Sequence, residues 1–284
     1  MIGSLLKKAA TLLSPQPTLA ELYVQHQGKA SDKWQLYLTE YERLLAPYRE
    51  RPVCLLEIGI QNGGSLDIWA KYFRRARALV GCDINKRCAQ LKYSDARIDV
   101  IIGDATCRDI QSELLKHGRF DIVIDDSSHK SGDIVKAFSA YFPAISDGGL
   151  FIAEDLHCSY WQNFDGGIFH PLSSMTFFKL LADVVNYEHW GLPEKRSWLL
   201  SDFIERYNLH LDESLLEQVH SVEFFNSVCV LRKRAPLVPA LGKRIVAGTE
   251  ASVDAAVLTV HNSTCPQRSQ RDNPFAQQAS IKKI

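Results

Sequence analysis

The chain has 284 residues, 46% of them apolar and 23% charged, which is typical of a globular protein with one large domain and smaller extensions. Basic and acidic side chains both number 33, so no net charge attracts nucleic acid or an anionic membrane, and we expect neither as a partner. No apolar run approaches the roughly 20 residues of a membrane span, and the start has no signal-peptide hydrophobic run. Cys54, Cys82 and Cys229 lie in apolar runs and no CxxC pair occurs, which favours reduced core thiols. The sequence therefore predicts a cytoplasmic protein that recognises its substrate through local contacts.

The first part of the chain predicts a helical extension followed by alternating strands and helices. A short amphipathic helix around Leu5 ends at Pro15. From residue 51 onwards, apolar strands alternate with amphipathic helices, which is typical of a parallel sheet with helical crossovers. The expected strands are 53–58, 78–83, 98–102, 120–125 and 149–153, and the helices between them begin near Ser65, Lys86, Cys107 and Ser131. This order predicts a doubly wound α/β fold of the Rossmann-like type.

The later part of the chain breaks the alternation. Two helical segments, 173–187 and 198–207, lead to two apolar runs, 221–225 and 228–232, that a two-residue polar turn joins. This is the pattern of an antiparallel hairpin, so we expect a mostly parallel sheet with a hairpin at its end. After Arg234, prolines and polar residues predict a weakly structured or disordered tail, although residues 256–260 could form a short strand. The predicted divisions are a helical lid or extension over 1–50, a domain over 51–234 and a tail over 235–284.

A glycine turn joins the first predicted strand to the next helix. Gly59, Gly63 and Gly64 let the backbone approach a ligand closely, and the helix that begins near Ser65 offers unpaired N–H groups. The spacing is not the GxGxxG of dinucleotide-binding proteins, and Glu57 would repel a diphosphate. The turn therefore favours an adenosyl cofactor without a pyrophosphate and disfavours a nicotinamide dehydrogenase.

Acidic residues end the next three strands. Asp83 is placed to accept two ribose hydroxyls, and Asp104 can meet an adenine amino group. The alternative is that the glycines only permit a tight turn and that these acids are solvated. The predicted cofactor-binding residues are Glu57, Gly59, Gly63, Ser65, Asp83, Asp104 and Asp125.

Two acid clusters follow the fourth and fifth strands. If these strands are parallel neighbours, Asp126, Glu154 and Asp155 converge at the carboxyl edge of the sheet, with His129 beside them. Hard oxygen ligands next to an imidazole indicate a divalent-cation site with a built-in base. Acidic ligands favour Mg²⁺ over zinc, with Mn²⁺ or Ca²⁺ as alternatives. Helix capping could explain single acids, but three converging acids exceed what capping requires.

The motifs resemble known enzymes at two levels. The Glu-x-Gly-x-x-x-Gly turn, Asp83 and the closing hairpin resemble class I S-adenosylmethionine-dependent methyltransferases over residues 51–234. The segments 124–131 and 153–161 resemble the metal-dependent sugar O-methyltransferases of the mycinamicin (macrolide glycoside) type and the related cephalosporin-biosynthesis methyltransferase. The resemblance implies that Asp126, Glu154 and Asp155 bind magnesium and that His129 is the catalytic base.

The resemblance also implies the reaction. The cofactors would be S-adenosyl-L-methionine and Mg²⁺, and the methyl group would pass to a hydroxyl of a sugar or glycosylated metabolite. Segment 31–34 resembles the lid of this group, and Tyr160, Trp161, the 166–167 turn and 188–190 supply groups suited to a sugar. The group usually has glycine where Ser127 stands, so a positive-φ turn there would be strained or reshaped.

Other interpretations remain open. The same fold and metal could act on another hydroxylated small molecule, such as an antibiotic nucleus or a catechol-like ring. A protein of another class would be a non-catalytic nucleotide-binding module. His157 beside Cys158 lacks a second Cys–His pair at zinc spacing, so we expect it near the substrate, behind the metal ligands, or in plain packing. The sequence leaves a homo-oligomer open.

Overall fold

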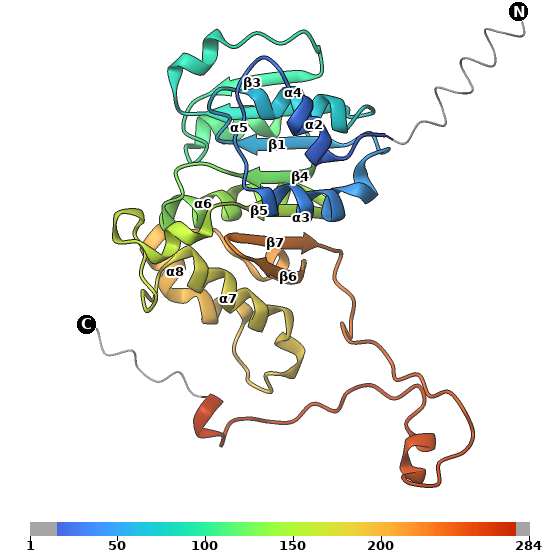
Figure 1. Ribbon diagram of the computed structural model, residues 1–284. Helices are drawn as coiled ribbons and strands as arrows, with labels where there is room; N and C mark the ends of the chain where they lie inside the picture. Colours follow the sequence, from blue (N-terminus) through green and yellow to red (C-terminus); the bar gives the residue numbers. More distant parts are fainter. Residues whose placement is uncertain (1–15, 277–284) are drawn as a thin grey trace, which may run out of the picture. The chain divides into compact units, whose positions relative to one another are not determined.

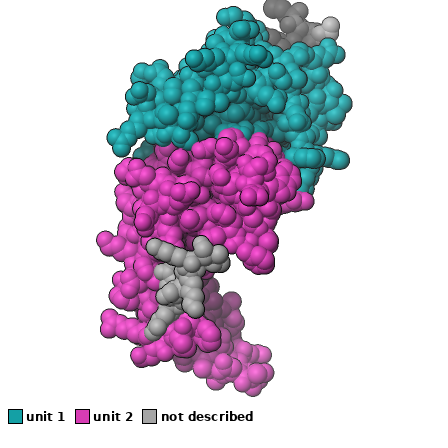
Figure 2. Space-filling model, turned by 90° about the vertical axis from the view of Figure 1, so that its left-hand side faces the viewer, with its two compact units in different colours: residues 1–127 teal, residues 128–284 magenta. Residues whose placement is uncertain are grey.

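The computed structural model describes residues 16–276, so the helix predicted around Leu5 lies outside the described residues. The chain divides into two compact units, residues 1–127 and residues 128–284 (Figure 2). Seven strands form one sheet in the order β3-β2-β1-β4-β5-β7-β6. The predicted α/β fold with a mostly parallel sheet and an antiparallel end is therefore confirmed (Figure 1).

Unit 1 contains the parallel strands. Its strands pair as β1 with β2, β1 with β4, and β2 with β3. Every residue of β1 is buried, as expected for the apolar central strand of a parallel sheet. The helices and strands are α2 (Leu19–Gln25), α3 (Gln35–Leu45), β1 (Cys54–Ile58), α4 (Gly64–Tyr72), β2 (Ala78–Asp83), β3 (Ile98–Ile102), α5 (Arg108–Leu115) and β4 (Phe120–Asp125).

The register of unit 1 brings the ends of its strands together. Ile58, the last residue of β1, is level with Cys82 on one side and Asp125 on the other. The next residue after β4 keeps this alignment, because the Asp126 amide donates to the Ile58 carbonyl at 2.9 Å. The glycine turn, Asp83 and the first acid cluster therefore lie at one edge, where open α/β sheets bind ligands.

Unit 2 contains the antiparallel part. Strand β5 pairs with β7, and β7 pairs with β6 across the predicted Asn226–Ser227 turn. Phe138 lies at the centre of an aromatic core, with ring centroids 4.8 Å from Phe142, 5.5 Å from Phe151 and 5.4 Å from Phe177. The elements are α6 (Ser131–Tyr141), β5 (Ile145–Ala153), α7 (Ser174–Val185), α8 (Ser201–Tyr207), α9 (Glu213–Leu216), β6 (Val219–Phe225) and β7 (Val228–Lys233).

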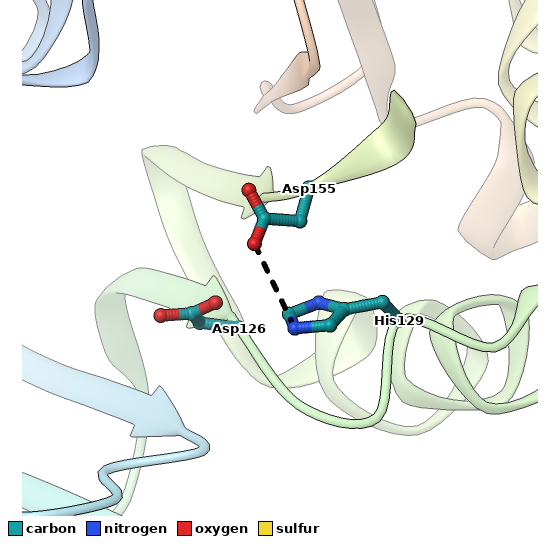
Figure 3. A group of neighbouring side chains, drawn as sticks. All are labelled: Asp126, His129 and Asp155. Atoms are coloured by element: carbon teal, nitrogen blue, oxygen red, sulfur yellow. Dashed lines mark ion pairs between the residues drawn. The ribbon is translucent and has the colours of Figure 1, made fainter. Parts of the chain in front are cut away.

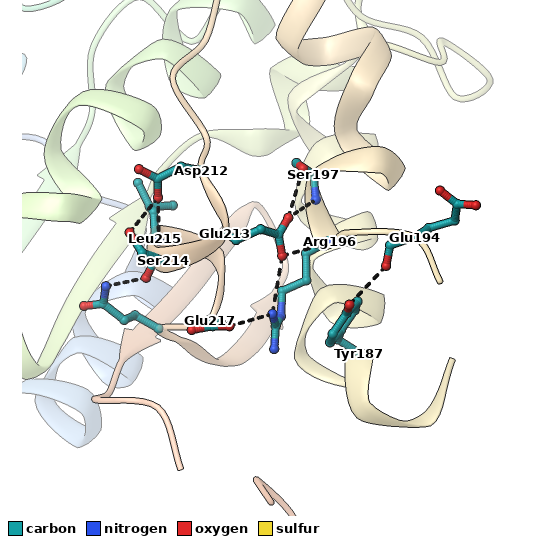
Figure 4. Close-up of polar contacts among 10 residues, drawn as sticks. Tyr187, Glu194, Arg196, Ser197, Asp212, Glu213, Ser214, Leu215 and Glu217 are labelled. Atoms are coloured by element: carbon teal, nitrogen blue, oxygen red, sulfur yellow. Dashed lines mark hydrogen bonds and ion pairs between the residues drawn. The ribbon is translucent and has the colours of Figure 1, made fainter. Parts of the chain in front are cut away.

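A polar cluster fastens the segment after α7 to α9 (Figure 4). Arg196 forms ion pairs with Glu213 at 3.4 Å and Glu217 at 3.1 Å, and its guanidinium lies 3.9 Å from the Tyr187 ring centroid. The Glu213 carboxylate also accepts hydrogen bonds from the backbone N–H and the hydroxyl of Ser197, both at 2.9 Å. This cluster holds together the connection that follows α7.

Three details differ from the predicted elements. Residues Lys86–Gln90 form a short 3₁₀ turn in place of the helix predicted to begin near Lys86. Strand β5 begins at Ile145, four residues before the predicted start, and it tolerates Gly148 at φ 77°. The strand considered for 256–260 is wrong, since Ala255–Thr259 form a 3₁₀ turn. Within the described part of the chain, no helix combines the length and apolar character needed to cross a membrane.

Candidate active site

The glycine turn after β1 packs tightly against other parts of unit 1. A Cβ atom on Gly59 would lie 2.0 Å from the Asp126 carbonyl oxygen, and Gly59 has φ 90°. A Cβ atom on Gly63, at φ 76°, would lie 2.1 Å from the Tyr93 hydroxyl oxygen. Neighbouring atoms of the protein therefore leave no room for a side chain at either position, whether or not a cofactor binds there.

The carboxylate of Asp83 binds the backbone of this turn. One oxygen accepts hydrogen bonds from the N–H groups of Ile60 at 3.1 Å and Gln61 at 2.9 Å, and the other accepts from Asn85 at 2.8 Å. Asp104 makes a similar local contact, accepting from the backbone and hydroxyl of Thr106. A carboxylate has about four acceptor positions, so Asp83 can hold the turn and still accept a ligand hydroxyl.

The buried side chain of Lys33 lies between the carboxylates of Glu57 and Asp126. Glu57 is 1% exposed and accepts a hydrogen bond from the Ser65 hydroxyl at 2.6 Å. The Lys33 ammonium lies 3.9 Å from Glu57 Oε1 and forms an ion pair and hydrogen bond with Asp126. Burial of a charge requires such pairing. The sequence placed Lys33 only in the lid, because no local pattern relates it to a residue 93 positions away.

The acid clusters supply a compact group of ligand atoms. Asp126, His129 and Asp155 each contribute one atom, and these atoms all lie within 4.8 Å of one another (Figure 3). Within unit 2, Nε2 of His129 lies 3.7 Å from Oδ2 of Asp155. Glu154, the third predicted ligand, does not join this group; its side chain is buried, and its metal-binding role remains a prediction.

Several residues of this region have left-handed backbone conformations. His129 has φ 58°, Asp155 has φ 52°, and Gln61 in the glycine turn has φ 47°. Such conformations cost about 1 to 3 kcal/mol for residues other than glycine and occur often at functional sites. Ser127 is not among these residues, so the strain considered for this position is absent, and the left-handed residue of the turn is His129.

His157 and nearby aromatic rings flank Asp155. His157 Nδ1 lies 3.9 Å from Asp155 Oδ1, and the His157 and Trp161 ring centroids are 5.0 Å apart. Phe164 follows, 6.0 Å from Trp161 and 6.4 Å from the His129 ring. Trp161 is 49% exposed, so the rings form a partly open aromatic surface beside the imidazole of His129. The sequence predicted no role for Phe164, because its ring comes near His129 only through the 3₁₀ turn over Gln162–Phe164.

Other residues predicted on the substrate side contact other parts of the protein. The Glu188 carboxylate accepts from the backbone N–H groups of Ala240 and Leu241, and the Trp190 indole donates to the Asp183 carbonyl. A Cβ atom on Gly166 would lie 2.3 Å from the Ser159 carbonyl oxygen, so this glycine serves a tight turn.

Buried thiols do not add to the group of ligands. Burial, together with Asp83 and Asp104, raises the pKa of Cys82 to about 12. Burial and then Asp155 raise the pKa of Cys158. Among the described residues, neither thiol belongs to the group formed by Asp126, His129 and Asp155. The donors at this edge are carboxylate oxygens and imidazole nitrogens, a set that suits a hard divalent cation.

Comparison with known proteins finds that this chain is similar to methyltransferases. A family described as a methyltransferase domain, Methyltransf_24, matches residues 56–156. The 8-demethyl-8-alpha-L-rhamnosyl tetracenomycin-C 2'-O-methyltransferase of Streptomyces olivaceus is 37% identical over 188 residues, which cover 61% of this chain and 47% of that protein. Demethylmacrocin O-methyltransferase of Streptomyces fradiae is 33% identical over 190 residues, 64% of this chain and 47% of that protein.

A solved structure has the same fold. The MycE methyltransferase of the mycinamycin biosynthetic pathway, in complex with Mg, SAH and mycinamycin VI, matches with a TM-score of 0.63 and 26% identity. The match covers 78% of this chain and 54% of that one. The chain thus has the class I methyltransferase fold and spans about half the length of the curated relatives it matches.

Proposed function

We propose that this chain, whose residues 56–156 match a methyltransferase domain, is a Mg²⁺-dependent O-methyltransferase. It would transfer a methyl group from S-adenosylmethionine to a hydroxyl of a sugar or glycosylated metabolite. The observation that carries the proposal is the group of Asp126, His129 and Asp155, whose ligand atoms lie within 4.8 Å of one another. Further support comes from relatives named for methylating rhamnosyl tetracenomycin and from the MycE complex with Mg, SAH and a mycinamycin.

The donor set fits Mg²⁺. Asp126 and Asp155 offer the hard oxygen ligands that this ion prefers, and Glu154 is the third expected ligand. When bound, the ion would supply a Lewis acid that lowers the pKa of a substrate hydroxyl. No cysteine belongs to this group among the described residues, so the donors present match the predicted metal.

The residues at the ends of β1 to β3 fit the cofactor, which would supply an electrophilic methyl group. Glu57 is a buried carboxylate suited to the ammonium of an amino acid, and Asp83 has acceptor capacity for ribose hydroxyls. We propose that the remaining cofactor contacts come from Gly59, Gly63, Ser65, Asp104 and Asp125.

His129 would act as the base. It lies beside Asp126 and Asp155, so its imidazole can reach a hydroxyl held at the same position. The Asp155 carboxylate, 3.7 Å from Nε2, would stabilise the imidazolium that forms when His129 accepts the proton. His129 and Asp155 both have a left-handed backbone, and functional sites often contain strained conformations of this kind.

The aromatic surface supports a sugar as substrate. Trp161 and Phe164 present ring faces near His129, and sugar rings have apolar C–H faces that pack on such rings. We further propose the divisions predicted from the sequence, a lid over 1–50, the catalytic domain over 51–234 and a tail over 235–284, and a cytoplasmic location without nucleic-acid partners.

The test is a transfer assay with methyl-labelled S-adenosylmethionine and a panel of rhamnosylated and macrolide glycosides. Label should enter a glycoside in the presence of Mg²⁺, and excess chelator should abolish the transfer. Transfer to catechols but to no glycoside would show that the sugar assignment is wrong. Binding of S-adenosylhomocysteine without transfer to any acceptor would favour the non-catalytic module.

A further inference from the structure

The most unusual charge in unit 1 is the ammonium of Lys33. Its side chain is only 3% exposed, and it lies between two carboxylates that belong to different predicted sites. Asp126 is a proposed metal ligand and Glu57 is a proposed cofactor residue. Lys33 contacts Asp126 directly, whereas Glu57 lies 3.9 Å away. A single cation therefore faces both sites.

The segment that carries Lys33 is firmly attached to the cofactor turn. The Gly64 N–H donates to the Ala30 carbonyl at 3.1 Å, and Lys29 forms an ion pair with Asp67 at 2.8 Å. A Cβ atom on Gly64 would lie 2.2 Å from the Lys29 carbonyl oxygen, so the segment and the turn are in close contact. These contacts fix the backbone just before Lys33, so a change of partner by Lys33 would be a movement of its long side chain.

A divalent cation and Lys33 would oppose each other at Asp126. Repulsion between an ammonium and a dication at one carboxylate is twice that between two single charges at the same distance, and burial weakens its screening. Glu57 offers the ammonium a second carboxylate within reach of the same side chain. Lys33 can therefore yield Asp126 without leaving its charge uncompensated.

We propose that Lys33 competes with the divalent cation for Asp126 and moves its contact toward Glu57 when the cation binds. This inference rests on the proposed metal site and extends it. Lys33 would then be a positioning residue that sets the affinity for the cation. Its ammonium would exchange between Asp126, a metal ligand, and Glu57, a carboxylate of the cofactor pocket.

Direct binding of Mn²⁺, followed by electron paramagnetic resonance or calorimetry, tests this without turnover. Lys33→Met removes the competing charge, so the variant should bind Mn²⁺ roughly tenfold tighter than the wild-type chain, the scale of one charge-assisted hydrogen bond. Lys33→Gln is a second neutral variant in case the first does not fold. Lys33→Arg keeps the charge and should bind Mn²⁺ no tighter than the wild type.

Lys29→Met is the matched control, because it removes the same charge from the same segment at a residue paired with Asp67. Its Mn²⁺ affinity should stay within about twofold of the wild type, since a pair in which both side chains are partly exposed contributes little. Equal or weaker Mn²⁺ binding by both neutral Lys33 variants would overturn the competition. So would an equal gain in Lys29→Met, which would indicate a general charge effect. Failure of the wild-type chain itself to bind Mn²⁺ would instead remove the proposed metal site.

Discussion

The Nδ1 atom of His157 lies 2.5 Å from the Ser227 hydroxyl oxygen, although the two residues are 70 positions apart. The Ser227 carbonyl also accepts from the Leu156 N–H at 2.8 Å. The turn between β6 and β7 therefore holds the backbone and the imidazole that follow Asp155. Ser227 has φ 73°, an unfavourable conformation for serine, and it holds this conformation where its hydroxyl contacts His157.

Two substitutions at Ser227 separate its hydrogen bond from its backbone strain. Ser227→Ala should lower the free energy of unfolding by about 1 kcal/mol, because it removes the partner of His157. Ser227→Gly loses the same hydrogen bond but relieves a left-handed residue, a gain of about 1 kcal/mol, and should stay closer to the wild type. Urea unfolding measures both. A glycine variant less stable than the alanine variant would contradict the strain at this turn.

Loss of one metal ligand should abolish cation binding but not cofactor binding. Asp155→Asn keeps the side-chain shape and removes the charge that a hard cation requires. Calorimetry should show no Mn²⁺ binding and unchanged binding of S-adenosylhomocysteine. Asp165→Asn is the matched control, since Asp165 also has a left-handed backbone, at φ 55°, but lies outside the ligand group. Retained Mn²⁺ affinity in Asp155→Asn would exclude this carboxylate as a ligand.

Removal of the base should slow turnover without removing the metal. His129→Ala should lower kcat by about 10² to 10⁴, the usual contribution of a positioned general base. Activity should recover in part as the pH rises, because hydroxide can then take the proton of the substrate hydroxyl. Mn²⁺ binding is measured alongside. A variant that loses Mn²⁺ would identify His129 as a ligand, and an unchanged rate and pH profile would remove it from the mechanism.

Asp83 should affect the cofactor through the turn that it binds. Asp83→Ala should weaken binding of S-adenosylhomocysteine by about 1 to 3 kcal/mol, since the variant loses a charged acceptor and releases the N–H groups of Ile60 and Gln61. Asp83→Asn keeps one acceptor oxygen and should lose less. Calorimetry with NAD is the comparison, and no NAD binding is expected. Tight NAD binding without S-adenosylhomocysteine binding would contradict the cofactor assignment.

Glu213 should make stability depend on pH. Burial raises its pKa, but hydrogen bonds from Ser197 and Arg196 outweigh this effect, and the net pKa is lowered from 4.5. A lowered pKa in the folded state stabilises the protein above the unfolded pKa, and this contribution is lost as the pH falls through the folded value. Glu213→Gln should therefore cost about 1 to 2 kcal/mol near neutral pH and progressively less as the pH falls below the unfolded pKa and through the folded one.

Urea unfolding of Glu213→Gln over a series of pH values from neutral to acid checks this. Glu217→Gln is the control, because Glu217 pairs with the same Arg196 but its side chain is 41% exposed. Such a pair is screened by water and should contribute little. An equal loss across the whole pH series in Glu213→Gln would show that packing, rather than charge, accounts for its effect.

Much of the fold followed from local patterns in the chain. The β2, β3 and β4 strands have the predicted bounds, because apolar runs that end in Asp or Gly predict buried parallel strands well. The hairpin across Asn226 and Ser227 was equally readable. Asp126, His129 and Asp155 could be proposed together, since each follows a strand and parallel strands meet at one edge.

Contacts between distant segments required the tertiary structure. Lys33 meets Asp126 and Ser227 meets His157 only because packing brings together residues that no periodic pattern relates. The burial of Glu154 and the left-handed backbone of His129 are likewise decided by neighbouring elements rather than by residue type. Residue type and period thus determined the strands and the chemistry at their ends. Packing decided which of those groups meet, because contact depends on distances that spacing along the chain does not contain.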